Sequence, residues 1–217
     1  MGTKPLIATA GCIAAAVVAC SSAPSVGDSS IASAAIRELL ERGDYQSAEL
    51  AARRQFDLVR TTTGEQSFEA ASSVDLLVEA LLDNGRGSSE EANRLADFAL
   101  SRKQALLETD SIELVPSLRN LARVKEDRAE AGAVEFLQRA IAIQGPHSGD
   151  DPASLARTLR YLSLTLNRQN RVDDAVKAAE RAVALTDARA GDREQARSFE
   201  ALVRVCLLYT SPSPRDS

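Results

Sequence analysis

Side chains that could perform catalysis are few in this sequence of 217 residues. The only histidine, His147, lies in a loop rich in glycine and proline, and the three cysteines are Cys12, Cys20 and Cys206. One histidine cannot build a metal cluster, and a single loop histidine without a usable thiol in the folded part indicates neither a Ser/His nor a Cys/His arrangement. Because the interpretation below leaves no such thiol, we expect no catalytic site, no bound metal and no cofactor.

Carboxylates and glycines do not change this expectation. Three pairs of adjacent acids lie at expected helix starts: Glu90-Glu91, Asp150-Asp151 and Asp173-Asp174. Acids at such positions interact favourably with the helix dipole and cap free amides, which explains them without acid–base catalysis. The segment NGRG at residues 84–87 lacks the lysine and serine of a phosphate-binding loop. The residues present therefore predict a protein that is not an enzyme.

Cys20 has the surroundings of a lipid-attachment site. Residues 6–18 are uncharged and mostly apolar, a run too short to cross a bilayer, which takes a helix of about 20 residues. We therefore interpret residues 1–19 as a signal peptide. The sequence VVACS at residues 17–21 resembles a bacterial lipobox, which implies cleavage before Cys20 and attachment of lipid to it. An ordinary secretory signal with an incidental cysteine is the alternative.

A lipid on Cys20 would anchor the protein to a membrane of the cell envelope, on its periplasmic or extracytoplasmic face. Ser21, directly after it, favours the outer membrane in a Gram-negative host. Residues 20–30 are mostly small and polar and include a proline, which is typical of a flexible tether. The folded part is then expected to begin near Ile31 and to contain no disulfide.

The clearest organisation lies in residues 151–185, which indicate two amphipathic helices joined by a polar turn at residues 167–173. Large apolar residues recur in the first half at three- and four-residue spacing: Leu155, Leu159, Leu162 and Leu166. Such spacing places them on one helical face. The second half carries a stripe of small residues: Ala175, Ala179 and Ala182. Small residues let the second helix pack closely against the first.

The same pair recurs along the chain. Its reference alanine is found at four places, with spacings of 44, 41 and 42 residues: Ala48, Ala92, Ala133 and Ala175. Seven residues later, three repeats keep a second alanine and the first has Gln55 instead: Ala99, Ala140 and Ala182. The segments SLRNLA, TLRYLS and SFEALV also align as first helices. An irregular helical bundle, the alternative, would not explain these nearly equal spacings.

This pattern resembles the tetratricopeptide repeat (TPR), in the longer subtype of about 42 residues found in kinesin light chains and many bacterial signalling proteins. The resemblance rests on a large, large, small, large series, followed by the small residues of the second helix: Leu159, Leu162, Ser163 and Leu166. It implies an all-α fold, a right-handed solenoid of antiparallel helix pairs. We expect about four pairs and a truncated fifth over residues 31–205.

Apolar periodicity and capping residues predict the helix bounds. The expected pairs are residues 31–42 with 45–60, 67–83 with 89–107, a helix from between Ile112 and Pro116 to Lys125 with 131–143, 152–166 with 174–185, and a fifth first helix from Asp192. Ser88 and Glu91 have the spacing of a capping box. Asp151 can cap a helix in which Pro152 takes the first position.

Residues 206–217, which begin CLLYTSPSPRD, resemble a translated sequencing adapter. We interpret them as non-native and expect the native gene to continue beyond Val205, because the fifth pair has no second helix. A natural, disordered Ser/Pro tail is the alternative.

First helices line the concave side of such a solenoid. The resemblance therefore implies a binding groove formed by Arg119, Arg123, Arg157, Arg160, Tyr161, Leu164, Asn167, Arg197 and Arg204. Arginine can bind a carboxylate through two parallel hydrogen bonds, so the expected partner is a protein or peptide with an acidic or carboxylate-terminated segment. A solvated helix face is the alternative. The formal net charge of −5 argues against nucleic acid as a partner.

These observations together predict a membrane-anchored, non-catalytic scaffold for protein interactions, of a bacterial TPR lipoprotein type. Two alternatives remain at this point. One is the sensing module of a larger, truncated enzyme, such as a CHAT-type caspase-like protease. The other is an envelope lipoprotein that assists the assembly of pili or secretion pores. The oligomeric state does not follow from the sequence.

Overall fold

The computed structural model describes residues 26–189 and 192–210. This part of the chain is helical, with two short 3-10 turns and no strand. Its helices are α1 (Val26–Arg42), α2 (Tyr45–Thr63), α3 (Phe68–Asp83), α4 (Glu90–Leu106), α5 (Val115–Asp127), α6 (Ala133–Gln144), α7 (Pro152–Arg168), α8 (Val172–Arg189) and α9 (Asp192–Thr210). The 3-10 turns are Ile112–Leu114 and Gly145–His147. The predicted signal peptide and Cys20 lie outside the described residues.

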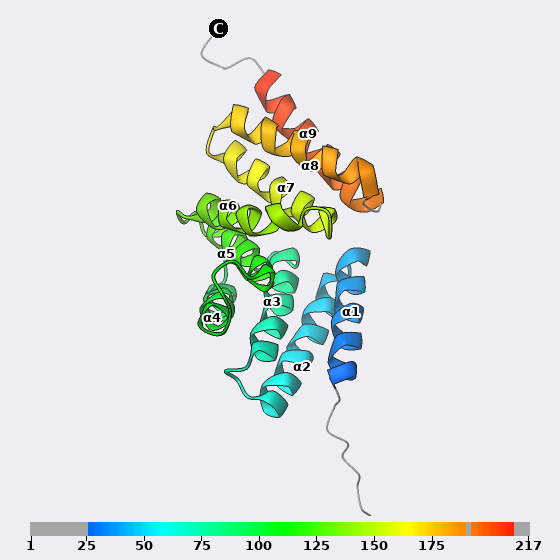
Figure 1. Cartoon of the computed structure of the whole chain (residues 1–217), viewed down its shortest axis with the longest axis vertical. Coiled ribbons are helices and arrows are strands. Elements are labelled where there is room, and N and C mark those ends of the chain that lie inside the picture. The colour runs from blue at the N-terminus through cyan, green and yellow to red at the C-terminus, as the bar shows by residue number, and fades with distance from the viewer. Residues whose placement is uncertain (1–25, 190–191, 211–217) are drawn as a thin grey trace, which may run out of the picture.

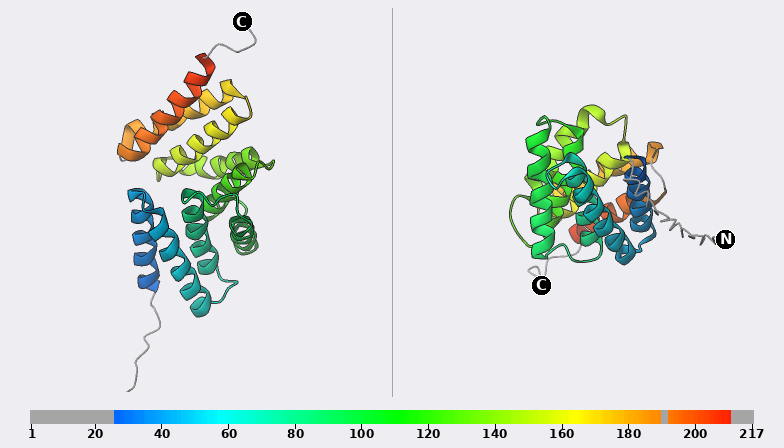
Figure 2. Two further views of the ribbon diagram at one scale, coloured as in Figure 1. Left: turned by 180° about the vertical axis from the view of Figure 1, so that it is seen from behind. Right: turned by 90° about the horizontal axis from the view of Figure 1, so that it is seen from below.

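The helices stack as a solenoid of antiparallel pairs (Figure 1). Each helix packs against the next one along the chain, and the odd-numbered helices α1, α3, α5, α7 and α9 also contact one another in succession. Seen from behind and from below, the stack rises from the first pair to α9 with successive pairs rotated about its long axis (Figure 2). The predicted solenoid of four pairs followed by a fifth first helix is confirmed.

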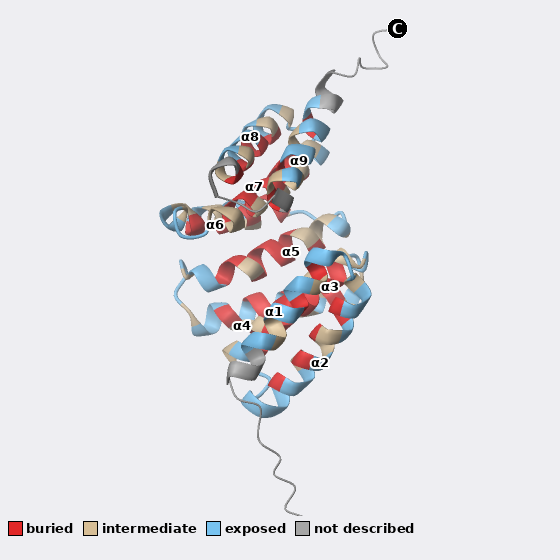
Figure 3. Ribbon diagram, turned by 90° about the vertical axis from the view of Figure 1, so that its right-hand side faces the viewer, coloured by how far each residue is buried: buried red, intermediate tan, exposed pale blue. Residues whose placement is uncertain are grey.

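Alanines determine how closely the pairs pack. The four reference alanines are buried, with at most 3% of their surface exposed: Ala48, Ala92, Ala133 and Ala175. The second alanines are completely buried: Ala99, Ala140 and Ala182. The buried faces of successive helices meet along the axis of the stack (Figure 3). The repeat register predicted from the alanine spacing is therefore correct.

Side-chain caps start several helices at the expected places. Asp151 accepts a hydrogen bond from the amide of Ser154 at 2.9 Å, and Pro152 occupies the first turn of α7. Ser67 caps α3 in the same way. The capping box predicted at Ser88 and Glu91 is wrong by one residue. Ser89 accepts the amide of Ala92 at 3.1 Å instead.

Glu91 does not fold back onto its own helix because the first pair offers it a stronger partner. Its carboxylate accepts two hydrogen bonds from the guanidinium of Arg53, at 2.6 and 2.9 Å. Glu49 lies in the same cluster and accepts hydrogen bonds from Arg53, Asn84 and Arg86. This charged cluster joins α2 to the turn between α3 and α4, and thus the first pair to the second.

The two ends of the helical part differ most from the prediction. α1 begins at Val26 rather than near Ile31, so part of the expected tether is helical. These residues are small and polar, so they have no apolar periodicity from which a helix could be predicted. Water can nevertheless form hydrogen bonds with the free amides at a helix end, so the helix can begin before its first apolar residue. α9 continues past Val205 to Thr210, into the segment interpreted as non-native. No helix of the described residues has the length and apolar character needed to span a membrane.

A buried polar cluster connects α3, α4 and α5. Lys103 and Asp75 form an ion pair with Nζ and Oδ2 2.7 Å apart, although Lys103 is only 2% and Asp75 only 5% exposed. Ser117 donates a hydrogen bond to the same Asp75 oxygen at 2.7 Å, and Lys103 donates another to the carbonyl of Glu113 at 3.0 Å. This cluster joins the second pair to the third.

Candidate functional site

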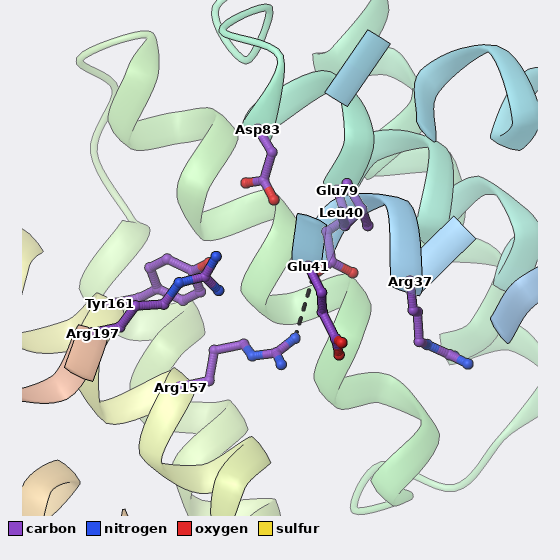
Figure 4. Close-up of a pocket in the computed structure, with 8 residues that line it drawn as sticks. All are labelled: Arg37, Leu40, Glu41, Glu79, Asp83, Arg157, Tyr161 and Arg197. Atoms are coloured by element: carbon purple, nitrogen blue, oxygen red, sulfur yellow. Dashed lines mark hydrogen bonds and ion pairs between the residues drawn. The ribbon is translucent and has the colours of Figure 1, made fainter. Parts of the chain in front are cut away.

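The concave side of the stack contains a cleft bounded by α1 and α3 on one side and by α7 and α9 on the other (Figure 4). Its lining residues are mostly charged: Arg37, Leu40, Glu41, Glu79, Asp83, Arg157, Tyr161 and Arg197. Curvature of the solenoid brings residues from the first pair opposite residues from the fourth and fifth. The resemblance predicted a groove on the first helix of each pair. The lining residues of the cleft all lie on odd-numbered helices, which are these first helices.

Three of the predicted arginines are bound to carboxylates of the protein itself. Arg157 donates a hydrogen bond across the cleft to Glu79 at 3.4 Å. Arg160 donates one to Glu194 at 3.1 Å. Arg123 donates one to Asp83 at 2.6 Å. The arginine groove is therefore largely neutralised by acids on α3 and α9.

Burial and these acids act in opposite directions on the arginines. Burial lowers the pKa of Arg157, but Glu79 and Glu194 outweigh it and the net shift is upward. Burial likewise lowers the pKa of Arg123, and Tyr161 and Asp83 reverse the effect. Both guanidinium groups stay charged at any physiological pH.

Tyr161 lies between two of these arginines. The guanidinium carbons of Arg160 and Arg123 are 4.5 and 4.7 Å from the centre of its ring. Such cation–π contacts hold arginine planes in fixed orientations. Tyr161 is half-buried, so it both orders the arginines and contributes to the lining of the cleft.

Arg119 is not part of the accessible surface. It is only 7% exposed, and it donates a hydrogen bond to the hydroxyl of Ser154 at 3.5 Å. Burial and the neighbouring Arg157 lower its pKa, although Glu79 counteracts them in part. We expect Arg119 to support the cleft from beneath, and not to meet a ligand directly as predicted.

A second hollow lies between α7 and α9. It is lined by Arg160, Leu164, Arg197, Glu200, Ala201 and Arg204. Four of these were predicted to bind the partner, and the structure brings them together around the apolar Leu164 and Ala201. Arg197 also lines the first cleft, so the two hollows are neighbours.

The arginines of the second hollow differ in how freely they could meet a ligand. Arg204 is paired with Glu200 at 3.3 Å, and both side chains are more than half exposed. Such an exposed ion pair contributes little to stability, and either side chain can readily pair with another charged group instead. Arg197 has no ion pair among the described residues. Asn167 is half-buried and lines neither of these two hollows, so the structure does not join it to the others.

The acidic residues that pair with these arginines were not predicted from the sequence. Glu79, Asp83 and Glu194 pair with arginines that are 34 to 78 positions away. Such separations leave no periodic signal in the sequence. Arg37 and Glu41 were also missed, because they belong to the first pair and reach the cleft only through the curvature of the stack.

Metal-binding side chains and the single histidine are the remaining groups that could support other chemistry. In residues 26–189 and 192–210, no group of three metal-binding side chains comes together. The side chain of His147 is 54% exposed, with Nδ1 3.5 Å from a carboxylate oxygen of Asp150, as expected of a solvated loop histidine. The site is suited to binding charged groups.

Comparisons with known proteins address the fold. The sequence matches no protein-family model and no curated protein sequence. Among solved structures, two crystal structures of the nearly identical TPR-like repeats of a putative kinesin light chain from Podosopora anserina are similar to it, one of them carrying a single substitution. The substituted form has a TM-score of 0.63 and 20% identity over 83% of this chain and 85% of that one. For the other structure the TM-score is 0.62 at 20% identity, over 83% and 86%. The predicted TPR-like fold is confirmed.

Proposed function

Taking this TPR-like solenoid as the premise, we propose that the protein is a non-catalytic interaction scaffold that binds a carboxylate-bearing peptide on its concave side. The fold supports binding of proteins in general. The proposed ligand is an extended segment that ends in a carboxylate or carries acidic side chains.

The hollow between α7 and α9 carries this proposal. Arg197 faces it without an ion-pair partner among the described residues, and Arg204 has only an exposed and exchangeable one. Leu164 and Ala201 provide an apolar surface beside these cations. A carboxylate could therefore bind Arg197 and Arg204 while the adjoining ligand side chain packs on the apolar surface.

The neighbouring cleft would extend this site rather than duplicate it. Its arginines already hold Glu79, Asp83 and Glu194, so an acidic ligand residue would have to replace one of these carboxylates. Exchange of one such ion pair for another releases little net free energy, because the pair that forms only replaces the pair that breaks. We expect an overall affinity in the micromolar range, near −8 kcal/mol, with most of the electrostatic gain from the hollow.

Attachment to a membrane through Cys20 is a separate part of the proposal. It is supported by the apolar run, the small residue before the cysteine and the polar segment after it. Two or three acyl chains would bind a bilayer almost permanently, because each buried methylene contributes about 0.8 kcal/mol. The scaffold would then present its groove at the periplasmic or extracytoplasmic face of the envelope.

A binding experiment can test the groove. Fluorescently labelled peptides with acidic residues and a free C-terminal carboxylate are titrated with the protein lacking residues 1–19, and the anisotropy is followed. Arg197→Gln combined with Arg204→Gln should weaken binding about tenfold or more, and amidation of the peptide C-terminus should have a similar effect. Affinity should also fall as salt rises.

Arg54→Gln is the matched control. Arg54 is an exposed arginine on α2, a second helix, and lines neither hollow. Its replacement removes one positive charge, as each of the two changes in the double variant does, and should leave the affinity unchanged. Peptide binding that persists in the Arg197/Arg204 double variant would show that these arginines are only a solvated face.

A further inference from the structure

A third hollow lies between two of the loops that connect successive pairs. We call it the loop hollow, and it is bounded by residues of the 3-10 turn Ile112–Leu114 before α5 and of the 3-10 turn Gly145–His147 before α7. It shares no lining residue with the cleft or with the hollow between α7 and α9. Its volume is about 330 Å³, compared with about 210 Å³ for the latter. Ligand sites in proteins begin at roughly 300 Å³, so the loop hollow is large enough to hold a ligand group.

One wall of the loop hollow is apolar. It is formed by Ile112, Val115 and Pro116, where the third pair begins. Val115 is buried, but Ile112 is 43% exposed. A ligand group that packs on this wall would remove the isoleucine side chain from water, which is favourable.

The buried side of the loop hollow offers a hydrogen-bond donor. Gln144, which is only 4% exposed, lines this side together with Ser154. The hydroxyl oxygen of Ser154 accepts hydrogen bonds from Nε2 of Gln144 at 3.0 Å and from Nη1 of Arg119 at 3.5 Å. Because both neighbours are donors, the hydroxyl proton of Ser154 is left for another acceptor. A carbonyl oxygen of a ligand can be that acceptor.

The exposed side of the loop hollow is acidic. Glu113, Asp150 and Asp151 line it, and no lysine or arginine of the described residues does. Glu113 forms no ion pair within the described part of the chain. The carboxylate of Asp150 lies 3.5 Å from Nδ1 of His147, and Asp151 uses one oxygen to cap α7. Three carboxylates without a lysine or arginine favour a cationic ligand group and disfavour an anionic one.

From these three surfaces we propose that the loop hollow binds a basic segment of a partner protein, in which a lysine or arginine stands next to an apolar residue. The cation pairs with Glu113 and Asp150, and the apolar side chain packs on Ile112. A peptide carbonyl accepts the hydrogen bond from Ser154. This proposal does not depend on the groove, whose arginines select the opposite charge.

An extended segment suits the loop hollow because neighbouring residues of one chain supply all three groups. The carbonyl, the apolar side chain and the cation then lie close together without a large or preformed ligand surface. A simple alkylammonium ion lacks the carbonyl acceptor. A ligand that bears a carboxylate would meet like charges on the exposed side of the hollow.

The probe is an acetylated and amidated peptide in which one lysine stands between two leucines, with glycines at both ends. It is titrated into the full chain, and the imidazole signals of His147 are followed by NMR. His147 is the only histidine of the chain and lines the loop hollow, so its signals report on this site. We expect saturable shifts and a weaker affinity at higher salt. A peptide with glutamine in place of lysine should bind at least about tenfold more weakly.

Two pairs of variants separate this site from the general surface. Glu113→Gln should weaken binding about fivefold, whereas Glu65→Gln, at an exposed position in the loop between α2 and α3, should leave it unchanged. Ile112→Ala should weaken binding about threefold, and Leu106→Ala, at a position 47% exposed, should not. Neither control residue lines one of the three hollows. Arg197→Gln should leave binding of the lysine peptide unchanged, which distinguishes this site from the groove.

Two results would overturn the proposal. The first is equal binding of the lysine and glutamine peptides, or an unchanged affinity in Glu113→Gln. The second comes from a peptide of leucines and glycines that has a free amino terminus and no lysine. If it binds as tightly as the lysine peptide, the loop hollow recognises a chain terminus and not a basic segment.

Discussion

Replacing Lys103 by methionine should destabilise the protein strongly, because it leaves Asp75 buried without its counter-ion. The ion pair is almost inaccessible to water, at 2% and 5% exposure. Removal of one partner from a buried pair costs about 3 to 5 kcal/mol. In a chain of 150 to 250 residues each kcal/mol shifts Tm by about 2 to 4 °C, so we expect Tm to fall by roughly 6 to 20 °C. Thermal and urea unfolding followed by far-UV circular dichroism measures this, since the chain has no tryptophan.

The pH dependence of this loss of stability shows whether it comes from the unpaired charge of Asp75. Burial raises the pKa of Asp75, and Lys103 opposes the rise. Without Lys103 the folded protein should hold a proton on Asp75 more readily than the unfolded chain does. A carboxyl whose folded pKa exceeds its unfolded value favours the folded state as the pH falls. The difference in stability between the variant and the wild type should therefore shrink between pH 7 and pH 4.

Removing the whole cluster should be much less harmful than removing Lys103. The second carboxylate oxygen of Asp75 has no hydrogen-bond partner, so the charged cluster is incompletely satisfied. Buried pairs replaced by apolar residues of similar size are often neutral or stabilising. We expect Asp75→Leu with Lys103→Met and Ser117→Ala to recover most of the loss. A single-variant cost below about 1 kcal/mol, or a triple variant as unstable as the sum of its parts, would refute this reasoning.

Four further changes test other parts of the structure. Ala182→Leu should lower the free energy of unfolding by about 1 to 3 kcal/mol through overpacking, and unchanged urea midpoints would contradict the close packing of α7 and α8. Leu118→Ala should cost about 2 to 5 kcal/mol through the cavity it leaves, which the same melts measure. Burial raises the pKa of Glu49, but Asn84, Arg53 and Arg86 outweigh it and the net shift is downward. A carboxyl with a lowered folded pKa stabilises the folded state above its unfolded pKa, about 4.5, and this stabilisation is lost as the pH falls through the lower folded pKa. The free energy of unfolding of Glu49→Gln should therefore change less with pH in this range than that of the wild type. Cys20→Ala should release the protein from membranes or leave it uncleaved, and fractionation and migration like those of the wild type would exclude the lipoprotein interpretation.

The helix pairs could be predicted from the sequence because their determinants are local. Alanines at i, i+4 and i+7, and leucines at three- and four-residue spacing, define one face of each helix whatever the rest of the chain does. Ala182 and Leu159 are buried together for this reason. The capping residue of α4 was misplaced because Ser88 and Ser89 are equally good caps. The choice between them depends on Glu91, which a distant arginine binds.

The state of the candidate groove could not be predicted in the same way. Periodicity places Arg157 and Arg160 on the concave side, and the structure puts them there. It does not reveal that Glu79 and Glu194 will meet them, since that depends on the rotation accumulated between pairs. Arg197 differs from its neighbours in having no ion pair among the described residues, and periodicity alone cannot distinguish it from them.

The ion pair between Glu79 and Arg157 has a consequence for how the chain folds. Most helix contacts join neighbours in sequence, so pairs can form quickly and independently and the stack can grow from any of them. Glu79 and Arg157 are separated by 78 positions and lie on helices two pairs apart. They can meet only when the second, third and fourth pairs have all docked. We expect contact between them to lag behind helix formation during refolding, so that a pair of fluorescent labels at these two sites would report the closing of the curved stack as a separate, later event.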